Sequence, residues 1–164
     1  METKEFIQKT LINGIGELVP KQAYFAFALI AVGIEFLGKC LDTENQDWNK
    51  SGMSKIHFEL VINKLNSFER YRKYLEKYSI WNSYRNGFAH SFVPKAPISL
   101  SSGEERIHLD VYNRCGLEWL NFKCEDFYED FKNACFEVIN MNFENHVDKM
   151  NKDLLSVPPD FKIL

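Results

Sequence analysis

The chain has few of the residues that break regular structure or cross-link it. Five prolines and eight glycines among 164 residues exclude a collagen-like chain and argue against extended disorder. The four cysteines (Cys40, Cys115, Cys124 and Cys135) form no CxxC pair, so we expect free thiols rather than a disulfide framework. HExxH and HxxxH pairs are also missing, and the sequence predicts no metal site and no cofactor.

Long hydrophobic runs and a recognisable leader are lacking too. The longest apolar run covers residues 23–34 before Glu35 interrupts it, whereas a membrane span needs about 20 apolar residues. Residues 1–9 are polar and of mixed charge, unlike a signal peptide. We therefore expect a cytoplasmic protein with no membrane segment, in which residues 23–34 belong to a buried helix.

The net charge of −3 is small but unevenly spread along the chain. Residues 64–95 contain seven basic and two acidic side chains, a balance of +5, which leaves −8 for the rest. A basic stripe of this kind either attracts a polyanion or forms an ordinary solvated helix face. Both interpretations remain open on charge alone.

Aromatic residues are plentiful, with 14 phenylalanines, and apolar positions recur at helical spacing. Ser54 and Ser67 are expected to cap helices, and a break is expected between Tyr78 and Ile80. Helices are predicted over residues 3–17, 21–41, 54–65 and 68–91 and from 125 onward.

The hydrophobic period changes after Pro94 and Pro97, which stop a helix. Strands are predicted over residues 98–101, 106–112 and 118–122. The sequence thus predicts a mainly α fold with a small antiparallel β-insert near 97–122. We expect a single domain over 1–155 and an extended tail over 156–164.

The most informative segment runs from Arg85 to His90 and reads RNGFAH. A guanidinium binds phosphate through a planar fork of donors, and an imidazole transfers protons near neutral pH. These two groups are parts of a site that cleaves a phosphodiester without a metal ion. The chain contains no competing segment of comparable chemistry.

The spacing around this segment indicates a shared surface. Asn82, Asn86 and His90 follow one another at intervals of four and would lie on one helix face. Tyr84 and Phe88 would take the opposite, core-facing side. Arg85 and His90, however, are about 140° apart around an ideal helix. Either the helix loosens at Gly87, or two copies combine their side chains across a twofold axis, and we favour the homodimer.

An arginine, a polar residue and a histidine at this interval resemble the signature of the HEPN family, helical domains named for higher eukaryotic and prokaryotic nucleotide binding. The resemblance implies an up-down helical bundle that dimerises through its motif helices. It also implies metal-independent RNA cleavage, often in toxins or defence proteins. Arg85 and His90 would fill the two motif positions, and Asn86 the one that follows the arginine. The β-insert departs from the minimal bundle.

In this hypothesis His90 acts as general acid or base, Arg85 stabilises the transition state, and Asn86 orients His90 or binds phosphate. The product carries a 2′,3′-cyclic phosphate. RNA contacts are predicted at Arg70, Arg72, Lys73, Lys77 and Asn82.

Three alternatives stay open. Arg85 can instead pair with Glu35 and His90 can be a structural residue at a helix end. The domain can be a non-catalytic module for a nucleotide, RNA or protein partner, or a toxin silenced by an antitoxin.

Overall fold

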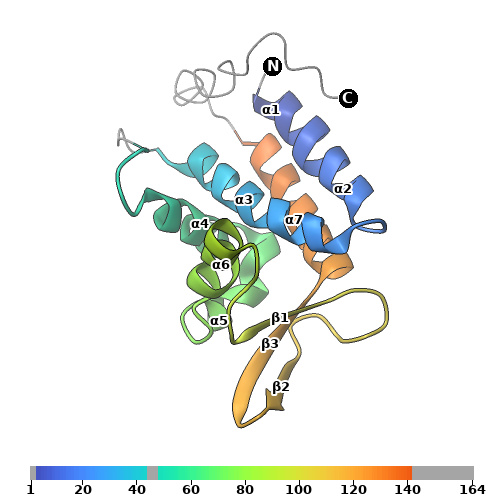
Figure 1. Ribbon diagram of the computed structural model, residues 1–164. Coiled ribbons are helices and arrows are strands. Elements are labelled where there is room, and N and C mark those ends of the chain that lie inside the picture. Colours follow the sequence, from blue (N-terminus) through green and yellow to red (C-terminus); the bar gives the residue numbers. More distant parts are fainter. Residues whose placement is uncertain (1–2, 44–47, 142–164) are drawn as a thin grey trace.

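The apolar run near residue 30 forms the central helix of the protein. In the computed structural model, which describes residues 3–43 and 48–141, helix α3 spans Ala23–Leu41. It packs against α4 (Met53–Lys64) and α7 (Cys124–Ile139), as Figure 1 shows. Buried side chains of α3 include Phe27 and Ile30. The predicted central helix is confirmed.

Residues 3–18 form a helical stretch that packs against α3 and α7. It consists of α1 (Thr3–Phe6), a π-helical segment η1 (Ile7–Gly14) and α2 (Ile15–Leu18). The Tyr128 hydroxyl on α7 donates to the Ile12 carbonyl oxygen at 2.7 Å and ties the two stretches together. The helix predicted over 3–17 is therefore confirmed.

The single helix predicted over 68–91 is wrong, although the break predicted within it is present. The chain forms η2 (Asn66–Tyr71, a 3-10 helix), α5 (Arg72–Leu75), a turn, η3 (Trp81–Arg85, π-helical) and α6 (Asn86–Ser91). Ser79 has a φ of 45°, in the left-handed region, so no right-handed helix passes through it.

The two serines expected as helix caps have other partners. Ser67 lies inside η2, where the backbone N–H groups of Asn66 and Ser67 donate to the Glu137 carboxylate from α7 at 3.0 and 2.8 Å. Ser54 lies inside α4, because Gly52 occupies the position before the helix. The Glu137 carboxylate thus takes the capping role predicted for Ser67, whereas no side chain caps the start of α4.

The three strands form a mixed sheet, not the antiparallel one predicted. Strands β1 (Ile98–Ser101), β2 (Val111–Arg114) and β3 (Leu117–Lys123) lie in the order β1-β3-β2. β3 pairs with β2 antiparallel and with β1 parallel. Residues 102–110 connect β1 to β2, which is not its neighbour in the sheet. β3 then follows β2 and lies between the two earlier strands.

The strand predicted over 106–112 begins only at Val111 because of a bulge. Leu109 has a φ of 59° and its N–H donates to the Asn121 carbonyl oxygen at 2.8 Å, while the Asn121 N–H donates to the Asp110 carbonyl oxygen at 2.9 Å. Two residues thus face one across the pair, which bends the strand and ends the ladder.

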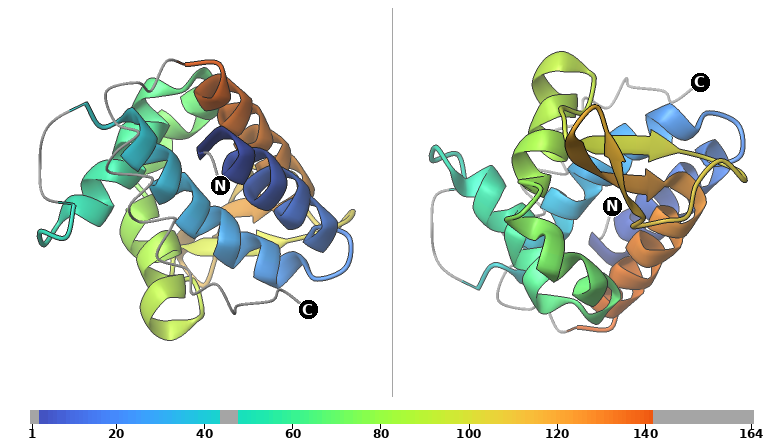
Figure 2. Two further views of the ribbon diagram at one scale, coloured as in Figure 1. Left: turned by 90° about the horizontal axis from the view of Figure 1, so that it is seen from above. Right: turned by 90° about the horizontal axis from the view of Figure 1, so that it is seen from below.

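One hydrophobic cluster joins the helices and the sheet. Leu120 and Phe122 of β3 are fully buried, and the Phe122 ring stacks on Phe127 of α7 with centroids 4.9 Å apart. Figure 2 shows the sheet lying across one end of the helices. The protein is mainly helical with a small sheet attached to the same core. The end of the predicted domain at 155 and the predicted tail over 156–164 lie outside the described residues.

Candidate functional site

The motif segment is attached to the core by two aromatic rings, as its spacing predicts. Tyr84 of η3 is fully buried, Phe88 of α6 is 5 % exposed, and the Tyr84 hydroxyl donates to the Phe27 carbonyl oxygen of α3. These contacts fix the rotation of the segment, so that Arg85 and His90 take their positions from the aromatic residues beside them.

Gly87 allows the chain to fold back closely after α6. A Cβ atom there would lie 2.7 Å from the Val93 carbonyl oxygen, and the Lys95 N–H donates to the Ser83 carbonyl oxygen at 2.7 Å. The helix remains α-helical through Gly87, and the wide turn of η3 comes before it. The loosening at Gly87, the less favoured of the two alternatives, is therefore not present, and the glycine serves a close backbone approach.

Arg85 pairs with Glu35 of α3, which is the alternative left open by the sequence. A terminal nitrogen of the guanidinium contacts Glu35 Oε2, and these side chains are only 17 % and 14 % exposed. Ser54 Oγ donates to the same carboxylate oxygen at 2.7 Å. Arg85 Nε is buried and has no hydrogen-bond partner among the described residues. The guanidinium is thus held by one carboxylate and keeps unused donors.

The polar face predicted around Asn82 is present in part. Asn86 Nδ2 donates to Asn82 Oδ1 at 3.2 Å, one turn away, so these two side chains share a face. His90 is exposed near the end of α6 and forms no hydrogen bond with a residue of ranges 3–43 and 48–141. One protomer therefore presents a free imidazole and, at a different angle, a guanidinium already bound to a carboxylate.

The predicted RNA-contacting cations are mostly engaged by neighbouring groups. Arg70 donates to Asp130 Oδ2 at 2.7 Å, and Lys77 Nζ lies 2.8 Å from Glu118 Oε2. Arg72 donates to the carbonyl oxygens of Ile62 and Leu65, each at 3.1 Å, and so caps the end of α4. Lys73 is exposed, and its Nζ lies 4.7 Å from the centroid of the Tyr74 ring.

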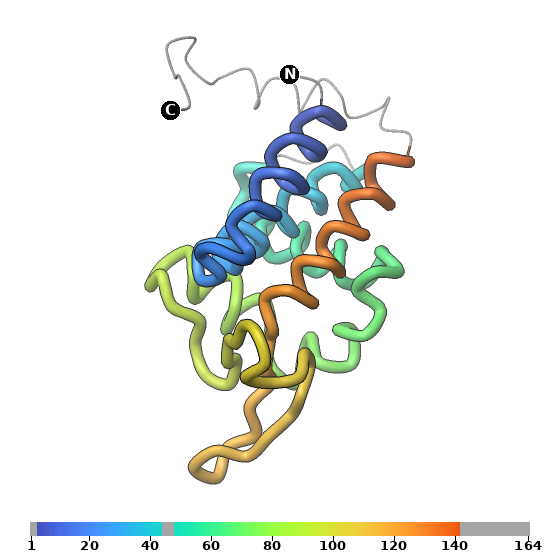
Figure 3. Tube along the Cα trace, turned by 90° about the vertical axis from the view of Figure 1, so that its right-hand side faces the viewer, coloured from blue at the N-terminus to red at the C-terminus, as the bar shows by residue number. Residues whose placement is uncertain are grey.

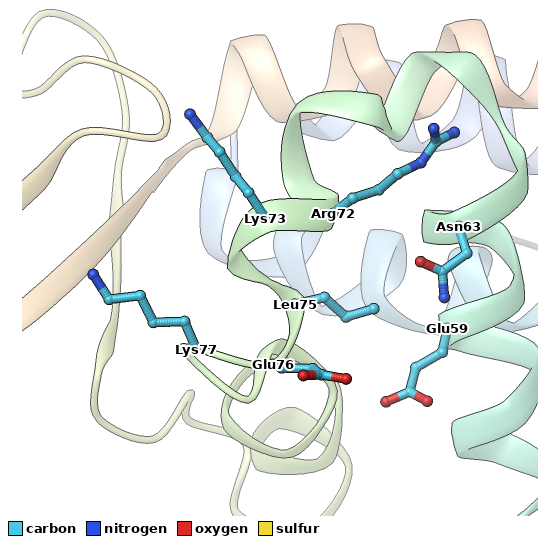
Figure 4. Close-up of a pocket in the computed structure, with 7 residues that line it drawn as sticks. All are labelled: Glu59, Asn63, Arg72, Lys73, Leu75, Glu76 and Lys77. Carbon is cyan, nitrogen blue, oxygen red and sulfur yellow. The ribbon is translucent and has the colours of Figure 1, made fainter.

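A groove of about 600 Å³ beside α5 carries both signs of charge. Figure 4 shows the carboxylates of Glu59 and Glu76 on one side of α5, with Lys73 and Lys77 directed away from them. The lining consists of Glu59, Asn63, Arg72, Lys73, Leu75, Glu76 and Lys77. The basic stripe is thus no continuous cationic surface, because helix breaks turn its members in different directions.

An exposed apolar face borders the motif, and the sequence analysis did not predict it. Phe25, Leu29 and Val32 of α3 are 48 %, 45 % and 57 % exposed, and Phe92 after α6 is 59 % exposed. We call these four residues the α3 face. Their spacing of four and three along α3 is that of an apolar stripe, but a helix that is apolar nearly all round does not reveal which side stays exposed.

Two apolar grooves flank the α3 face. One, of about 470 Å³, lies toward α6 and includes Phe88 and Ala89 in its wall. The other, of about 400 Å³, lies toward η1, and Leu29 and Val32 line both grooves. His90, which directly follows Ala89 in α6, is exposed as well.

A second polar cluster joins η2, α7 and the insert. The Tyr71 hydroxyl donates to Asp130 Oδ2 at 2.7 Å and lies 2.6 Å from His108 Nε2. The Lys123 backbone N–H donates to His108 Nδ1 at 3.0 Å, which makes Nε2 the protonated nitrogen. Burial raises the pKa of the Tyr71 hydroxyl well above its usual value, so it remains a donor. This cluster fastens the sheet to the helices.

The part of the chain that the structure describes has no metal-binding cluster and one helix of membrane-spanning length and composition. No three His, Cys, Asp or Glu side chains gather there to hold a metal ion. All four cysteines are free thiols, of which Cys115 is exposed. α3 alone has the length and apolar composition of a membrane span, and half of that stretch is buried against the rest of the protein.

Comparisons with known proteins assign no family to this chain. No protein-family model matches the chain, and no curated protein or solved structure matches it significantly.

Proposed function

We propose that this protein is a metal-independent RNA endonuclease of the HEPN type that acts as a homodimer. The observation that carries the proposal is the arrangement on one short helical segment. An exposed His90 and a guanidinium fixed by Glu35 lie on that segment, beside the exposed α3 face. A proton-transferring group, an anion-binding group and a surface for a second copy are thus adjacent.

The chemistry follows from the ribose of the substrate. An imidazole of His90 removes the proton from the 2′-hydroxyl, whose oxygen then forms a bond to phosphorus. The bond from phosphorus to the 5′-oxygen breaks, and a second histidine, in its protonated form, gives its proton to that oxygen. The products are a 2′,3′-cyclic phosphate and a free 5′-hydroxyl. In a twofold dimer the two copies of His90 supply the acid and the base.

The Glu35 ion pair holds the Arg85 guanidinium in a fixed position, from which it binds phosphate in this proposal. A guanidinium carries five N–H donors, and the carboxylate contacts only one terminal nitrogen. Donors that remain free can bind the phosphate oxygens and stabilise the charge of the transition state. In this proposal Asn86, whose side-chain amide donates to Asn82, binds phosphate or orients His90.

The α3 face supports the homodimer in this proposal. Exposed apolar surface of this extent is typical of an interaction site, and interfaces with twofold symmetry are self-complementary. A second copy seated on the grooves beside Ala89 would bring two α6 helices together. Arg70 and Lys73 line a further groove of about 560 Å³ that can hold the RNA backbone. Toxin or phage-defence roles, an antitoxin partner and a cytoplasmic site of action remain part of the proposal.

The test is incubation of the purified protein with RNA in EDTA. We expect cleavage that leaves 2′,3′-cyclic ends, and a rate that falls by about 10²-fold or more in His90→Ala. Ser91→Ala, at the neighbouring exposed position, serves as control and should cleave normally. Absence of cleavage, or equal cleavage by wild type and His90→Ala, would refute the nuclease.

A non-catalytic binding module is the second candidate, and the Glu35–Arg85 ion pair favours it. A guanidinium that is 17 % exposed and bound to a carboxylate is partly neutralised before any ligand arrives. This alternative predicts RNA or nucleotide binding without product. Binding that survives His90→Ala while no cleavage is found in wild type would select it.

A further inference from the structure

The hairpin formed by β2 and β3 extends beyond the helices. Figure 1 shows both strands leaving the body, and Figure 3 shows the same projection from the side. Its turn consists of Cys115 and Gly116, with φ of 52° and 78°, the tight two-residue form that suits an antiparallel hairpin. Its edge strand β2 is mostly exposed.

One face of this hairpin is aromatic and basic. Tyr112 lies directly opposite Trp119, and Arg114 lies opposite Leu117. Opposed residues of an antiparallel pair project to the same side, as do residues two apart, so all four share a face. The other face carries Leu120, which is fully buried in the core. The first face is therefore the outer one toward the turn, where Tyr112 and Trp119 are half-buried, whereas Asn121 further along the same face is covered by residues 101 and 107.

Two arginines lie on these rings. The Arg106 guanidinium carbon is 3.8 Å from the centroid of Tyr112, and the Arg114 guanidinium carbon is 5.9 Å from that of Trp119. Both arginines are exposed. Neither forms an ion pair or hydrogen bond with any residue in ranges 3–43 and 48–141, so all their donors stay available, unlike those of Arg70.

We propose that this outer face is a stacking platform for single-stranded RNA. The inference rests on the proposed function and adds how the substrate is held. Bases stack on aromatic rings and on guanidinium planes, while the same guanidinium donates to phosphate. A base can therefore lie on the exposed plane of Arg106, which itself lies on Tyr112. Bases in a duplex are already stacked, so the platform selects single strands.

The platform is connected to the motif helix through the sheet. α6 ends at Ser91 and β1 begins at Ile98, with Lys95 bonded back to Ser83 on η3. β2 lies two strands away from β1 in the sheet order, about 10 Å. The hairpin is thus joined to the segment that carries His90 through β1 and β3.

The experiment measures binding apart from cleavage. His90→Ala protein is titrated into a short fluorescein-labelled single-stranded RNA of mixed sequence, and anisotropy gives Kd at several salt concentrations. Adding Arg106→Ala with Arg114→Ala should raise Kd about tenfold, and the salt slope should fall by about 1.4. Tyr112→Ala should weaken binding and Tyr112→Phe should preserve it, because the ring supports the Arg106 guanidinium on which the base stacks.

Two matched double variants distinguish RNA binding at this surface from a non-specific effect of the protein's charge. Lys50→Ala with Lys64→Ala removes two exposed cations near the ends of α4 and should leave Kd within about twofold. Glu104→Gln with Glu105→Gln removes exposed carboxylates beside Arg106 and should tighten binding.

The inference is overturned if the two arginine substitutions leave Kd unchanged or act no more than the two lysine substitutions. It is also overturned if inorganic polyphosphate loses affinity to the same extent as RNA in Tyr112→Ala, since the Arg106–Tyr112 stack would then bind phosphate and not bases. If the wild-type protein binds RNA through this face but does not cleave it, the proposed nuclease function is refuted and the RNA-binding face is not.

Discussion

Arg85 forms an ion pair with Glu35 in which both side chains are mostly buried. This pair is present whether or not the protein is a nuclease. Removing one charge of such a pair leaves the other without compensation, which costs far more than an exposed pair. Ser54 adds a hydrogen bond to the same carboxylate. Arg85 therefore contributes to stability as well as to the proposed chemistry.

We predict that Glu35→Ala lowers the free energy of unfolding by about 3 kcal/mol, measured by urea denaturation. Arg85→Ala should cost a similar amount, and the double variant should cost clearly less than the sum, because the two residues are coupled. Lys9→Ala, which removes an exposed pair with Glu5, should change stability by less than about 1 kcal/mol. Additive effects would show that the ion pair is not a unit.

Elements are held together at a few close approaches, and the closest involves the crossing of α3 and α4. A Cβ atom on Gly38 would lie 2.0 Å from the His57 carbonyl oxygen and 2.4 Å from its carbon. These are backbone atoms and cannot rotate away. The absence of a side chain at Gly38 thus sets how close α4 lies to the central helix.

Gly38→Ala should destabilise the protein by about 3 kcal/mol, seen as a lower Tm, because the two helices must separate. Gly14→Ala is the matched control, since its nearest neighbour, the Lys9 carbonyl oxygen, would lie 3.6 Å away. That helical position favours alanine, and stability should rise by about 0.5–1 kcal/mol. A neutral Gly38→Ala would mean that the helices can shift freely.

The polar cluster that fastens the insert titrates with acid. Burial alone would raise the pKa of Asp130, but His108, Tyr71 and Arg70 hold it below its usual value. A lowered folded-state pKa stabilises the fold above the unfolded value, near 3.9, and this contribution is lost as pH falls further. The attachment of the sheet should therefore weaken in acid.

Asp130→Asn should lower the free energy of unfolding by about 1–3 kcal/mol at pH 7. The gap between variant and wild type should narrow as the pH falls below about 4, because the wild type protonates the same carboxyl as the pH approaches its lowered folded-state pKa. Urea denaturation across that range measures the gap. Asp126→Asn, at an exposed site paired with Lys123, should show a gap that is small throughout. A constant gap for Asp130→Asn would contradict the assignment.

At the scale of the whole molecule, the α3 face is apolar surface that a single chain leaves exposed to solvent. Leu29 and Val32 separate two apolar grooves and are themselves about half exposed. Burying such surface in a dimer contributes roughly 25 cal/mol per Å² before the costs of association. The proposed nuclease depends on this assembly if two copies of His90 share the chemistry.

Val32→Glu should convert a dimer to a monomer in sedimentation velocity, because a charge at the centre of an apolar interface stays unpaired. The fold should survive, since Val32 is 57 % exposed in one chain. Ile107→Glu, at a 78 % exposed position on the insert, should leave the dimer intact. A wild type that is monomeric at high concentration would remove the shared site.

Helical periodicity and the prolines after the motif were enough to predict most elements from the sequence. These signals are local: Tyr84 and Phe88 face the core because their spacing demands it. The functional hypothesis at Arg85 and His90 also came from local chemistry.

What the sequence alone determined is which residues carry reactive groups and which sides of the helices are apolar. Only the tertiary structure decided that Arg85 meets Glu35, that β1 pairs with β3 and that the basic stripe divides among separate surfaces. The physical reason is distance along the chain. A carboxylate fifty residues away, a parallel strand or a bulge at Leu109 leaves no periodic trace, because its position depends on how the whole core packs.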